Sequence, residues 1–384
     1  MAGAASIPIL DLSWADGPKR AELLEQLRSA LFDVGFLYIR HHGVSSTIIK
    51  DLTDMLPTLF ELPAKEKASL SKLNSPHFLG YSGFAEETTL GKQDLREQYD
   101  FATELPVVYE APLNDEGANV GRGKRNFSQL YWRLRGPNQW LELPGFKDAF
   151  TAYHDAVQDL SYRFVHLIEE AFDIPVGTCD HFFGRQDPEV TTAGRYTTSN
   201  GASKSFLPPQ HRIKLLRYPP SSDPTQAQGV GAHKDSSGWL TFLCQVGGEP
   251  GLEVQSADGR WIKAPPIEGT FVVNFGNAFE AATDGAVKAT IHRVIAPGPD
   301  NNVRYSIPFF QGLPLDMTVS EIRSYIPERV RRLRKEAGGD DGVSSFLDPR
   351  WDSLGDSQLR KWIRSHRDVG LKWYGQEVVD FYTA

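Results

Sequence analysis

The stretch Gly229-Val-Gly-Ala-His-Lys-Asp-Ser-Ser-Gly-Trp-Leu-Thr-Phe, residues 229–242, places a histidine and an aspartate two positions apart beside an apolar, β-prone run. Side chains two residues apart on a strand point the same way, so His233 and Asp235 can close on one ion. Taken alone this H-x-D pair is weak evidence, because the histidine could be a loop residue and the aspartate a turn or capping residue. Its meaning depends on residues further along the chain.

A second stretch, residues 286–311, carries His292 and then an R-x-S pair. We expect a strand over 286–295 that places Lys288, Thr290 and His292 on one face. Two histidines and one carboxylate form the facial triad of non-haem Fe(II) sites, which leaves three coordination positions open. Zinc is the rival ion, since the same donors make catalytic zinc sites. However, the sequence lacks the H-E-x-x-H motif typical of them.

The R-x-S pair, Arg304 and Ser306, suits the carboxylate of a bound acid. The planar guanidinium donates two parallel charge-assisted hydrogen bonds, and Ser306 can donate a third. Tyr218, in Arg217-Tyr-Pro-Pro, could add another from a neighbouring strand. A bidentate 2-oxo acid would then take two of the open iron positions and O2 the last. A surface cation on a strand is the alternative interpretation of Arg304.

Composition excludes several classes of function. The chain has 384 residues, a net charge of −8 and two cysteines. Nucleic-acid binding needs clustered basic residues, and the one basic run, 329–335, lies in a helical pattern. Residues 1–16 lack the features of a secretory signal, and no run is long enough to span a membrane. Two cysteines do not make a disulfide scaffold, so we expect a cytoplasmic protein.

Apolar periodicity predicts helices over 19–34, 47–60, 146–172, 319–337 (with a break at Pro327) and 357–369. Residues 78–101 resemble a loop that reaches over a site, and 106–135 an irregular excursion. From residue 212 onward, short β-prone runs alternate with glycine and proline, which is typical of a jelly roll rather than of βαβ units. We therefore divide one integrated catalytic unit into 1–115, 116–211, 212–314 (the catalytic core) and 315–384.

The residues resemble the isopenicillin N synthase-like branch of the Fe(II)/2-oxoglutarate-dependent oxygenases. The matching motifs, in order and over most of the chain, are Ile7-Pro-Ile-Leu-Asp-Leu, Gly35-Phe-Leu-Tyr-Ile, His42-Gly-Val, Gly80-Tyr-Ser-Gly, Leu216-Arg-Tyr-Pro-Pro, His233-Lys-Asp, Gly251-Leu-Glu-Val, Gly259-Arg-Trp, Val273-Asn-Phe-Gly, His292-Arg-Val and Arg304-Tyr-Ser-Ile-Pro-Phe-Phe.

This resemblance implies a distorted double-stranded β-helix flanked by N-terminal, central and C-terminal helices. It implies that His233, Asp235 and His292 bind the iron, and that Arg304 and Ser306 bind the far carboxylate of 2-oxoglutarate. Tyr218 falls on the family's co-substrate tyrosine position. The cofactors implied are Fe(II), 2-oxoglutarate and O2, and no catalytic side chain beyond the metal site is required.

Three features depart from the family pattern. Lys234 stands where threonine is common, and its charge beside the metal edge bears on substrate choice. Asn277 stands where an aspartate often follows the glycine. The insertion 191–210 has no counterpart, and could be a loop near the substrate entrance or a disordered segment.

The expected activity is hydroxylation, desaturation or ring formation on a small molecule, such as an apolar or aromatic secondary metabolite. Phe310 and Lys214 are candidate substrate contacts, although a core phenylalanine and a surface lysine are equally good interpretations. Two alternatives remain: an iron oxidase that does not use 2-oxoglutarate, with a variant that fragments 2-oxoglutarate, and a non-catalytic binding protein. The sequence does not determine the oligomeric state.

Overall fold

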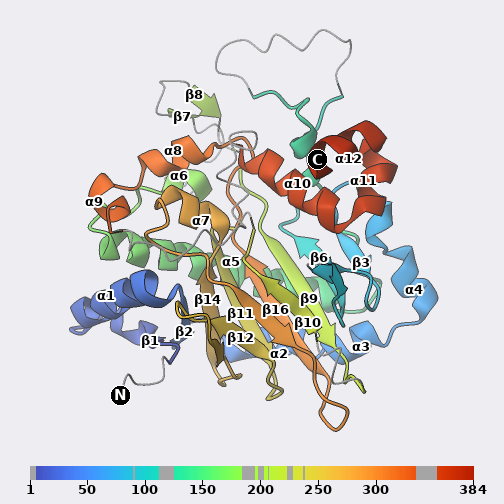
Figure 1. Cartoon of the computed structure of the whole chain (residues 1–384), viewed down its shortest axis with the longest axis horizontal. Coiled ribbons are helices and arrows are strands. Elements are labelled where there is room, and N and C mark those ends of the chain that lie inside the picture. The colour runs from blue at the N-terminus through green and yellow to red at the C-terminus, as the bar shows by residue number, and fades with distance from the viewer. Residues whose placement is uncertain are drawn as a thin grey trace.

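The computed structural model describes residues 6–89, 91–111, 125–183, 195–197, 203–205, 207–222, 228–236, 238–333 and 353–384. Two β-sheets face each other at its centre, and helices surround them (Figure 1). The larger sheet has the order β1 (Ile9–Asp11), β2 (Phe36–Arg40), β14 (Thr270–Phe275), β11 (Leu240–Val246), β16 (Arg304–Phe310), β9 (Arg212–Tyr218), β6 (Glu97–Ala102) and β3 (Gly80–Ser82). The smaller has the order β10 (Gln228–His233), β15 (His292–Ile295), β12 (Leu252–Gln255) and β13 (Trp261–Lys263).

Alternation along β2 shows how the layers are built. Phe36 and Tyr38 belong to a buried cluster between the two sheets, together with residues of β10, β12 and β15. Leu37 and Ile39 point the opposite way, into a cluster shared with the long helix α5 (Phe146–Ala171). Successive strand residues face opposite sides, so one β-prone run supplies both cores. The expected double-stranded β-helix with flanking helices is confirmed.

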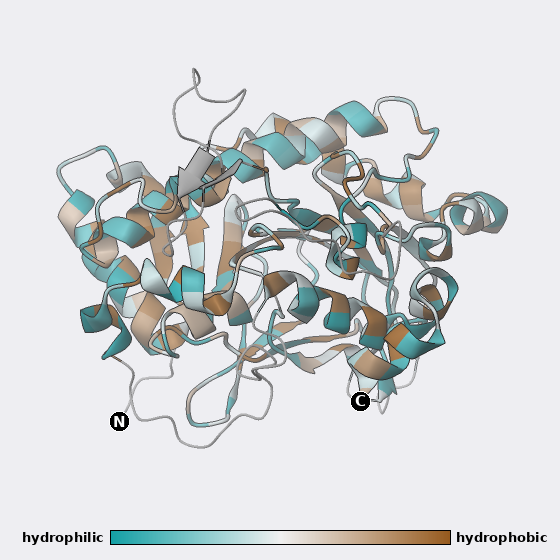
Figure 2. Cartoon of the chain, turned by 90° about the horizontal axis from the view of Figure 1, so that it is seen from above, coloured by the Kyte–Doolittle hydropathy of each residue, from teal (hydrophilic) through white to brown (hydrophobic). Residues whose placement is uncertain are grey.

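Figure 2 shows hydrophilic and hydrophobic residues interleaved along many of the helices that surround these sheets. The helices of the described residues are α1 Arg20–Ser29, α2 Ser46–Thr53, α3 Leu56–Phe60, α4 Ala64–Ser69, α5 Phe146–Ala171, α6 Asp180–Phe183, α7 Asn277–Ala282, α8 Val319–Ser324, α9 Glu328–Arg331, α10 Leu354–Ser365, α11 Arg367–Tyr374 and α12 Gln376–Thr383. None of them combines the length and hydropathy that a membrane-crossing helix needs.

Several predicted helices are shorter or divided. The helix predicted over 47–60 splits into α2 and α3, with Pro57 in the first turn of α3. The one predicted over 19–34 ends in a π-helical turn, Ala30–Val34, before Gly35 at φ 66°. Pro327 separates α8 from α9 as expected, and residues 334–337 lie outside the described residues. A break at His366 separates α10 from α11, and α12 was not predicted.

The strand predicted over 286–295 is wrong in its first half, because only His292–Ile295 pairs in a sheet. Local polar contacts replace the ladder upstream: the Ala289 amide donates to Glu280, and Thr290 donates to the Val34 carbonyl. Lys288 is therefore exposed and does not share a strand face with His292.

Residues 78–101 are not a simple loop, since they include β3, β4 (Thr88–Thr89), β5 (Lys92–Gln93) and the start of β6. Every residue of β6 is buried in the larger sheet.

The proposed division at 115/116 lies outside the described residues, and the division of the chain into four segments stays a prediction. In the insertion 191–210, the described residues include a two-stranded hairpin of β7 (Arg195–Thr197) and β8 (Ser203–Ser205), while much of the rest is not described. Its role at a substrate entrance also stays a prediction.

Candidate functional site

Three side chains that could hold a metal ion meet in the smaller sheet, where β10 ends and β15 begins. His233 ends β10 and His292 begins β15, and the two are direct partners in the strand register. Asp235 lies just beyond the end of β10, held by a hydrogen bond of 2.8 Å from the Asn277 amide to its carbonyl. Its Oδ1 lies 3.8 Å from Nε2 of His233 and 3.6 Å from Nε2 of His292. The expected convergence is therefore present, although Asp235 lies in the irregular segment after β10 rather than on a common strand face.

Each of these side chains has its remaining polar atom tied to the protein. Nδ1 of His233 contacts the Gly231 carbonyl at 2.8 Å, and Nδ1 of His292 contacts the Thr290 carbonyl at 3.0 Å. A carbonyl only accepts, so both imidazoles carry their proton on Nδ1 and direct the Nε2 lone pair inward.

The carboxylate of Asp235 is oriented in a similar way. Its Oδ2 accepts hydrogen bonds from Thr241 Oγ1 at 2.6 Å and from Asn274 Nδ2 at 2.7 Å, which leaves Oδ1 for a metal.

The charge state of the cluster fits a divalent cation. Burial lowers the pKa of His233 to about 3, with a further contribution from His292. Burial acts to raise the pKa of Asp235, but the two histidines and the hydrogen bonds from Thr241 and Asn274 outweigh it and lower the pKa to about 2. An unprotonated imidazole and an ionised carboxylate are the forms that bind metals. The donor set, two nitrogens and one oxygen with other positions open, is that of a non-haem Fe(II) site.

Arg304 is buried on β16 with only 1% of its surface exposed. Its Nη1 donates to Ser306 Oγ at 3.3 Å and its Nη2 to Gln245 Oε1 at 3.0 Å. Nε has no hydrogen-bond partner among the described residues. No carboxylate of the described residues lies within ion-pairing distance of the guanidinium. Burial lowers the pKa of this group. A buried cation that lacks a counter-ion is suited to binding the carboxylate of a ligand.

Tyr218 lies opposite Arg304 in the β9–β16 register, with the guanidinium carbon 5.0 Å from its ring centroid. Gln245, which the sequence did not single out, faces Ser306 from β11 in the same way. Its only signal in the sequence is its place in a β-prone run, so the register was needed to find it.

All the candidate site residues predicted from the sequence line one cavity of about 210 Å³. They are His233, Asp235, His292, Arg304, Ser306, Tyr218, Phe310 and Lys214. Lys214 is not the surface residue considered as an alternative, because its side chain is only 14% exposed.

Two histidines earlier in the chain have other contacts. His41 pairs with Asp11 at 2.8 Å and His42 packs on Phe271, so neither belongs to the metal cluster. Lys234, whose charge was expected to affect substrate choice, also lines the cavity and lies 3.3 Å from Glu280.

The helical wall of the cavity could not be predicted in detail. Its charged and aromatic residues come from the β3–β6 region and from the C-terminal helices, which the sequence suggested only as general pocket regions. They are Glu87, Asp94, Arg96, Lys361, Trp362 and His366. No local motif marks them.

Comparison with known proteins now gives the family. Residues 7–143 match the model of the non-haem dioxygenase in morphine synthesis N-terminal region, and residues 209–312 match that of the 2OG-Fe(II) oxygenase superfamily. The 2-oxoglutarate-dependent dioxygenase frbJ of Dothideomycetidae sp. is 37% identical over 378 residues, covering 96% of this chain and 92% of its own. A 2-oxoglutarate-dependent dioxygenase of Gibberella zeae is 30% identical, covering 96% and 91%.

Among solved structures, a full-length Neurospora crassa protein in complex with alpha-KG and thymine has the same fold, with a TM-score of 0.64 at 21% identity. The match covers 95% of this chain and 98% of that one. The two relatives are dioxygenases that depend on 2-oxoglutarate, which sets aside an oxidase that dispenses with it and a non-catalytic binding protein. This chain therefore belongs to the 2OG-Fe(II) oxygenase superfamily, and it is a 2-oxoglutarate-dependent dioxygenase that uses Fe(II) and O2.

Proposed function

We propose that His233, Asp235 and His292 bind the Fe(II) ion. The observation that carries this assignment is the convergence of their free ligand atoms, which all lie within 4.8 Å of one another. Bound Fe(II), with 2-oxoglutarate and O2, supplies the oxidising chemistry. The protein contributes by holding both imidazoles in one tautomer and by leaving one carboxylate oxygen free.

We also propose that Arg304 and Ser306 bind the carboxylate of 2-oxoglutarate that lies far from the iron. Arg304 supports this role because it is buried among neutral partners, so that a bound carboxylate would supply its missing counter-ion. Tyr218 flanks the guanidinium and completes this end of the cavity. Phe310 and Lys214 remain candidates for substrate contact, because they line the same cavity as the iron ligands.

The substrate is a small molecule, bound in the space that the iron and 2-oxoglutarate leave. The reaction is a hydroxylation, a desaturation or a ring formation. A substrate from secondary metabolism fits the fungal relatives.

Anaerobic optical titration of the purified protein tests these assignments. We expect a weak visible band that requires both Fe(II) and 2-oxoglutarate, and that is missing in His292→Ala. His41→Ala, which removes an exposed histidine away from the cluster, is the matched control and should keep the band. Iron binding without a band would contradict the 2-oxoglutarate assignment, while full iron binding by His292→Ala would contradict the metal assignment.

We also propose that the protein acts in the cytoplasm, with neither nucleic acid nor a membrane surface as a partner. The net charge of −8 and the two free, buried cysteines, Cys179 and Cys244, support this location. Microscopy of the tagged full chain checks it, and a nuclear or secretory-pathway signal would contradict it.

A further inference from the structure

Lys361, on α10, brings a positive charge to the cavity that no described group neutralises. The residue lines both the main cavity and a smaller adjoining one of about 40 Å³. Its ammonium makes no hydrogen bond or ion pair with the described residues, and it lies 5.5 Å from the centre of the Trp362 ring. Burial, followed by the charge of Lys214, lowers its pKa to about 8, so the group is still mainly a cation at neutral pH.

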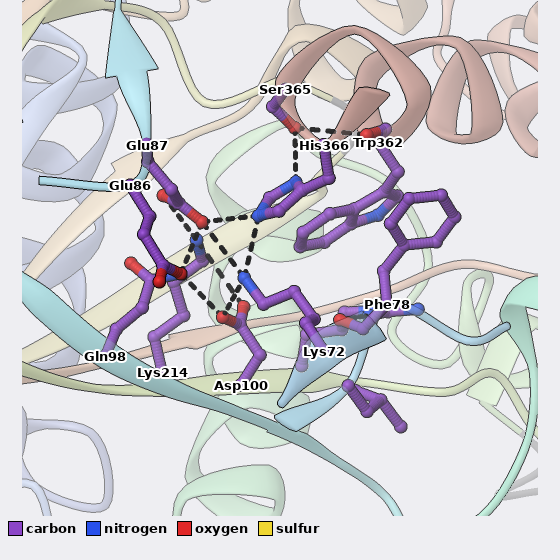
Figure 3. Close-up of polar contacts among 12 residues, drawn as sticks. Lys72, Phe78, Glu86, Glu87, Gln98, Asp100, Lys214, Trp362, Ser365 and His366 are labelled. Carbon is purple, nitrogen blue, oxygen red and sulfur yellow. Dashed lines mark hydrogen bonds and ion pairs between the residues drawn. The ribbon is translucent and has the colours of Figure 1, made fainter. Parts of the chain in front are cut away.

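The other charges on this wall balance one another. Lys72 lies 2.7 Å from Asp100 and 3.0 Å from Glu87, and Lys214 lies 3.4 Å from Asp100. Figure 3 shows Lys72 and Lys214 directed at these two carboxylates, with His366 beside them. The three cations of this cluster face three carboxylates: Lys72, Arg96 and Lys214 against Glu87, Asp94 and Asp100.

Two neighbouring groups leave this balance unchanged. Burial and the charge of Lys72 lower the pKa of His366, which keeps the imidazole neutral at pH 7. Lys234, elsewhere on the cavity wall, has its own partner in Glu280. Arg212, which lines the smaller cavity, has no carboxylate partner among the described residues either, but its guanidinium donates to the carbonyls of His77, Leu134 and Phe78. Lys361 therefore differs from the other cations here, because its ammonium has neither an ion-pair partner nor a hydrogen-bond partner among the described residues.

On the opposite wall, which carries the metal cluster and Arg304, positive and negative charges are equal once Fe(II) and 2-oxoglutarate are bound. Under the proposed function, the two charges of Fe(II) and the one of Arg304 meet the carboxylate of Asp235 and the two of 2-oxoglutarate. Lys361 remains, and it lines the same cavity as the metal cluster. Lys361 is partly buried, and a partly desolvated charge gains from a partner, so this position favours a ligand with one negative charge.

We propose that the substrate is a small organic acid and that Lys361 binds its carboxylate. This inference rests on the proposed function, because it assigns Arg304 to 2-oxoglutarate. A carboxylate fits better than a phosphate, since one unpaired cation matches one negative charge and not two. Trp362, beside the ammonium, offers an apolar surface to the carbon chain next to that carboxylate.

The two cavities also suggest how the acid lies. Ser236, Phe310, Lys214, Lys361 and Trp362 line both of them. The carboxylate end would lie at this junction, and the rest of the molecule would extend through the main cavity toward the metal cluster. Lys361 is then a specificity-determining residue that touches the substrate and takes no part in iron or 2-oxoglutarate binding.

The test uses the full-length holoenzyme with saturating Fe(II) and 2-oxoglutarate, and measures substrate-stimulated succinate formation. The probes are matched pairs of small fatty, aryl and N-acyl amino acids and their primary amides, together with the corresponding amines. We expect the best stimulant to be an acid, and its amide to be at least about 30-fold weaker, the effect of losing one buried charge partner. A best stimulant that is neutral or cationic overturns the proposal.

Three variants connect the preference to Lys361. Lys361→Met should raise the KM of the best acid by about 30-fold or more and abolish the preference over the amide. Lys361→Arg, which keeps the charge, should recover most of the affinity, and Arg364→Met, which removes an exposed cation from the same helix, should change nothing. An unchanged KM in Lys361→Met overturns the proposal.

The visible band that requires both Fe(II) and 2-oxoglutarate distinguishes a failure of this inference from a failure of the proposed function. If the band forms in the wild type and all three variants but the acid preference is missing, this inference fails alone. If the wild type forms no band, the proposed function fails.

Discussion

The two walls of the cavity are built in different ways. On the sheet wall, the site residues are fixed over shorter separations in the sequence. His233 contacts a carbonyl two residues away, and Arg304 contacts a hydroxyl two residues away and an amide oxygen 59 residues away. On the helical wall, partners meet from opposite ends of the chain: His366 contacts Glu87 across 279 residues and Lys72 across 294.

This difference separates the chemistry from the choice of substrate. Under the proposed function, the sheet wall directs its side chains at the iron and at 2-oxoglutarate, and the geometry of Arg304 and Ser306 follows from strand spacing. The helical wall is an ion-pair cluster held by packing between α10 and the β3–β6 region. It also carries Lys361, whose ammonium has no ion-pair partner among the described residues. The contrast predicts that substitutions on one wall leave the property of the other unchanged.

The largest effect is expected from Lys72→Met on the helical wall. The side chain is 3% exposed and pairs with Glu87 and Asp100, so its loss leaves buried carboxylates unpaired. We expect the free energy of unfolding to fall by about 3–5 kcal/mol in urea denaturation, while the folded protein keeps its iron affinity. The control is Lys50→Met, which breaks an exposed pair with Asp54 and should cost less than about 1 kcal/mol. Equal effects of the two changes would show that the cluster does not stabilise the fold.

The next effect, on the sheet wall, is that of Arg304→Ala. Removing the charge-assisted hydrogen bonds should raise the KM for 2-oxoglutarate by about 100-fold, with iron binding unchanged. Succinate formation as a function of 2-oxoglutarate concentration measures this. Arg293→Ala, on neighbouring β15 and paired with Glu253, is the control and should keep the wild-type KM. An unchanged KM in Arg304→Ala would remove the assignment of the carboxylate site.

The smallest effect is expected from Thr241→Val, which keeps the side-chain shape but removes one hydrogen bond to Asp235. Because outer partners orient metal ligands, iron affinity should fall by at least about tenfold. Anaerobic equilibrium dialysis with Fe(II) measures the affinity, with exposed Thr47→Val as the control. The free energy of unfolding of the iron-free protein should change much less than in Lys72→Met, and a reversed order would contradict the separation of the two walls.

Helices and strands were predictable from the sequence where the apolar residues recur with one regular spacing. The apolar stripe of α5 predicted its bounds to within one residue at its C-terminal end, and the short strands after residue 212 predicted the jelly roll. β6 was missed, since Glu97 and Asp100 within it suggest a loop. In the fold, Glu97 lies 3.0 Å from Lys67 and 2.5 Å from Arg217, which allows a charged strand to be buried.

The prediction of a strand over residues 286–291 was wrong for a related reason. Hydrogen bonds from Ala289 to Glu280 and from Thr290 to Val34 hold that segment, and strand propensity contains no information about them. Asp235 was likewise predicted to converge with His233, but for the wrong geometric reason, since it lies in an irregular segment after β10 that the Asn277 amide holds.

The sequence by itself determined the chemistry, because H-x-D, the distal histidine and R-x-S occur together, in order, among short β-prone runs, and their donor atoms suit a metal ion and a carboxylate. Only the tertiary structure decided which charges on the opposite wall neutralise one another and that Lys361 is left over. The reason is physical, because the Coulomb energy of a pair depends on distance and burial, and both are set by packing between segments far apart in the chain.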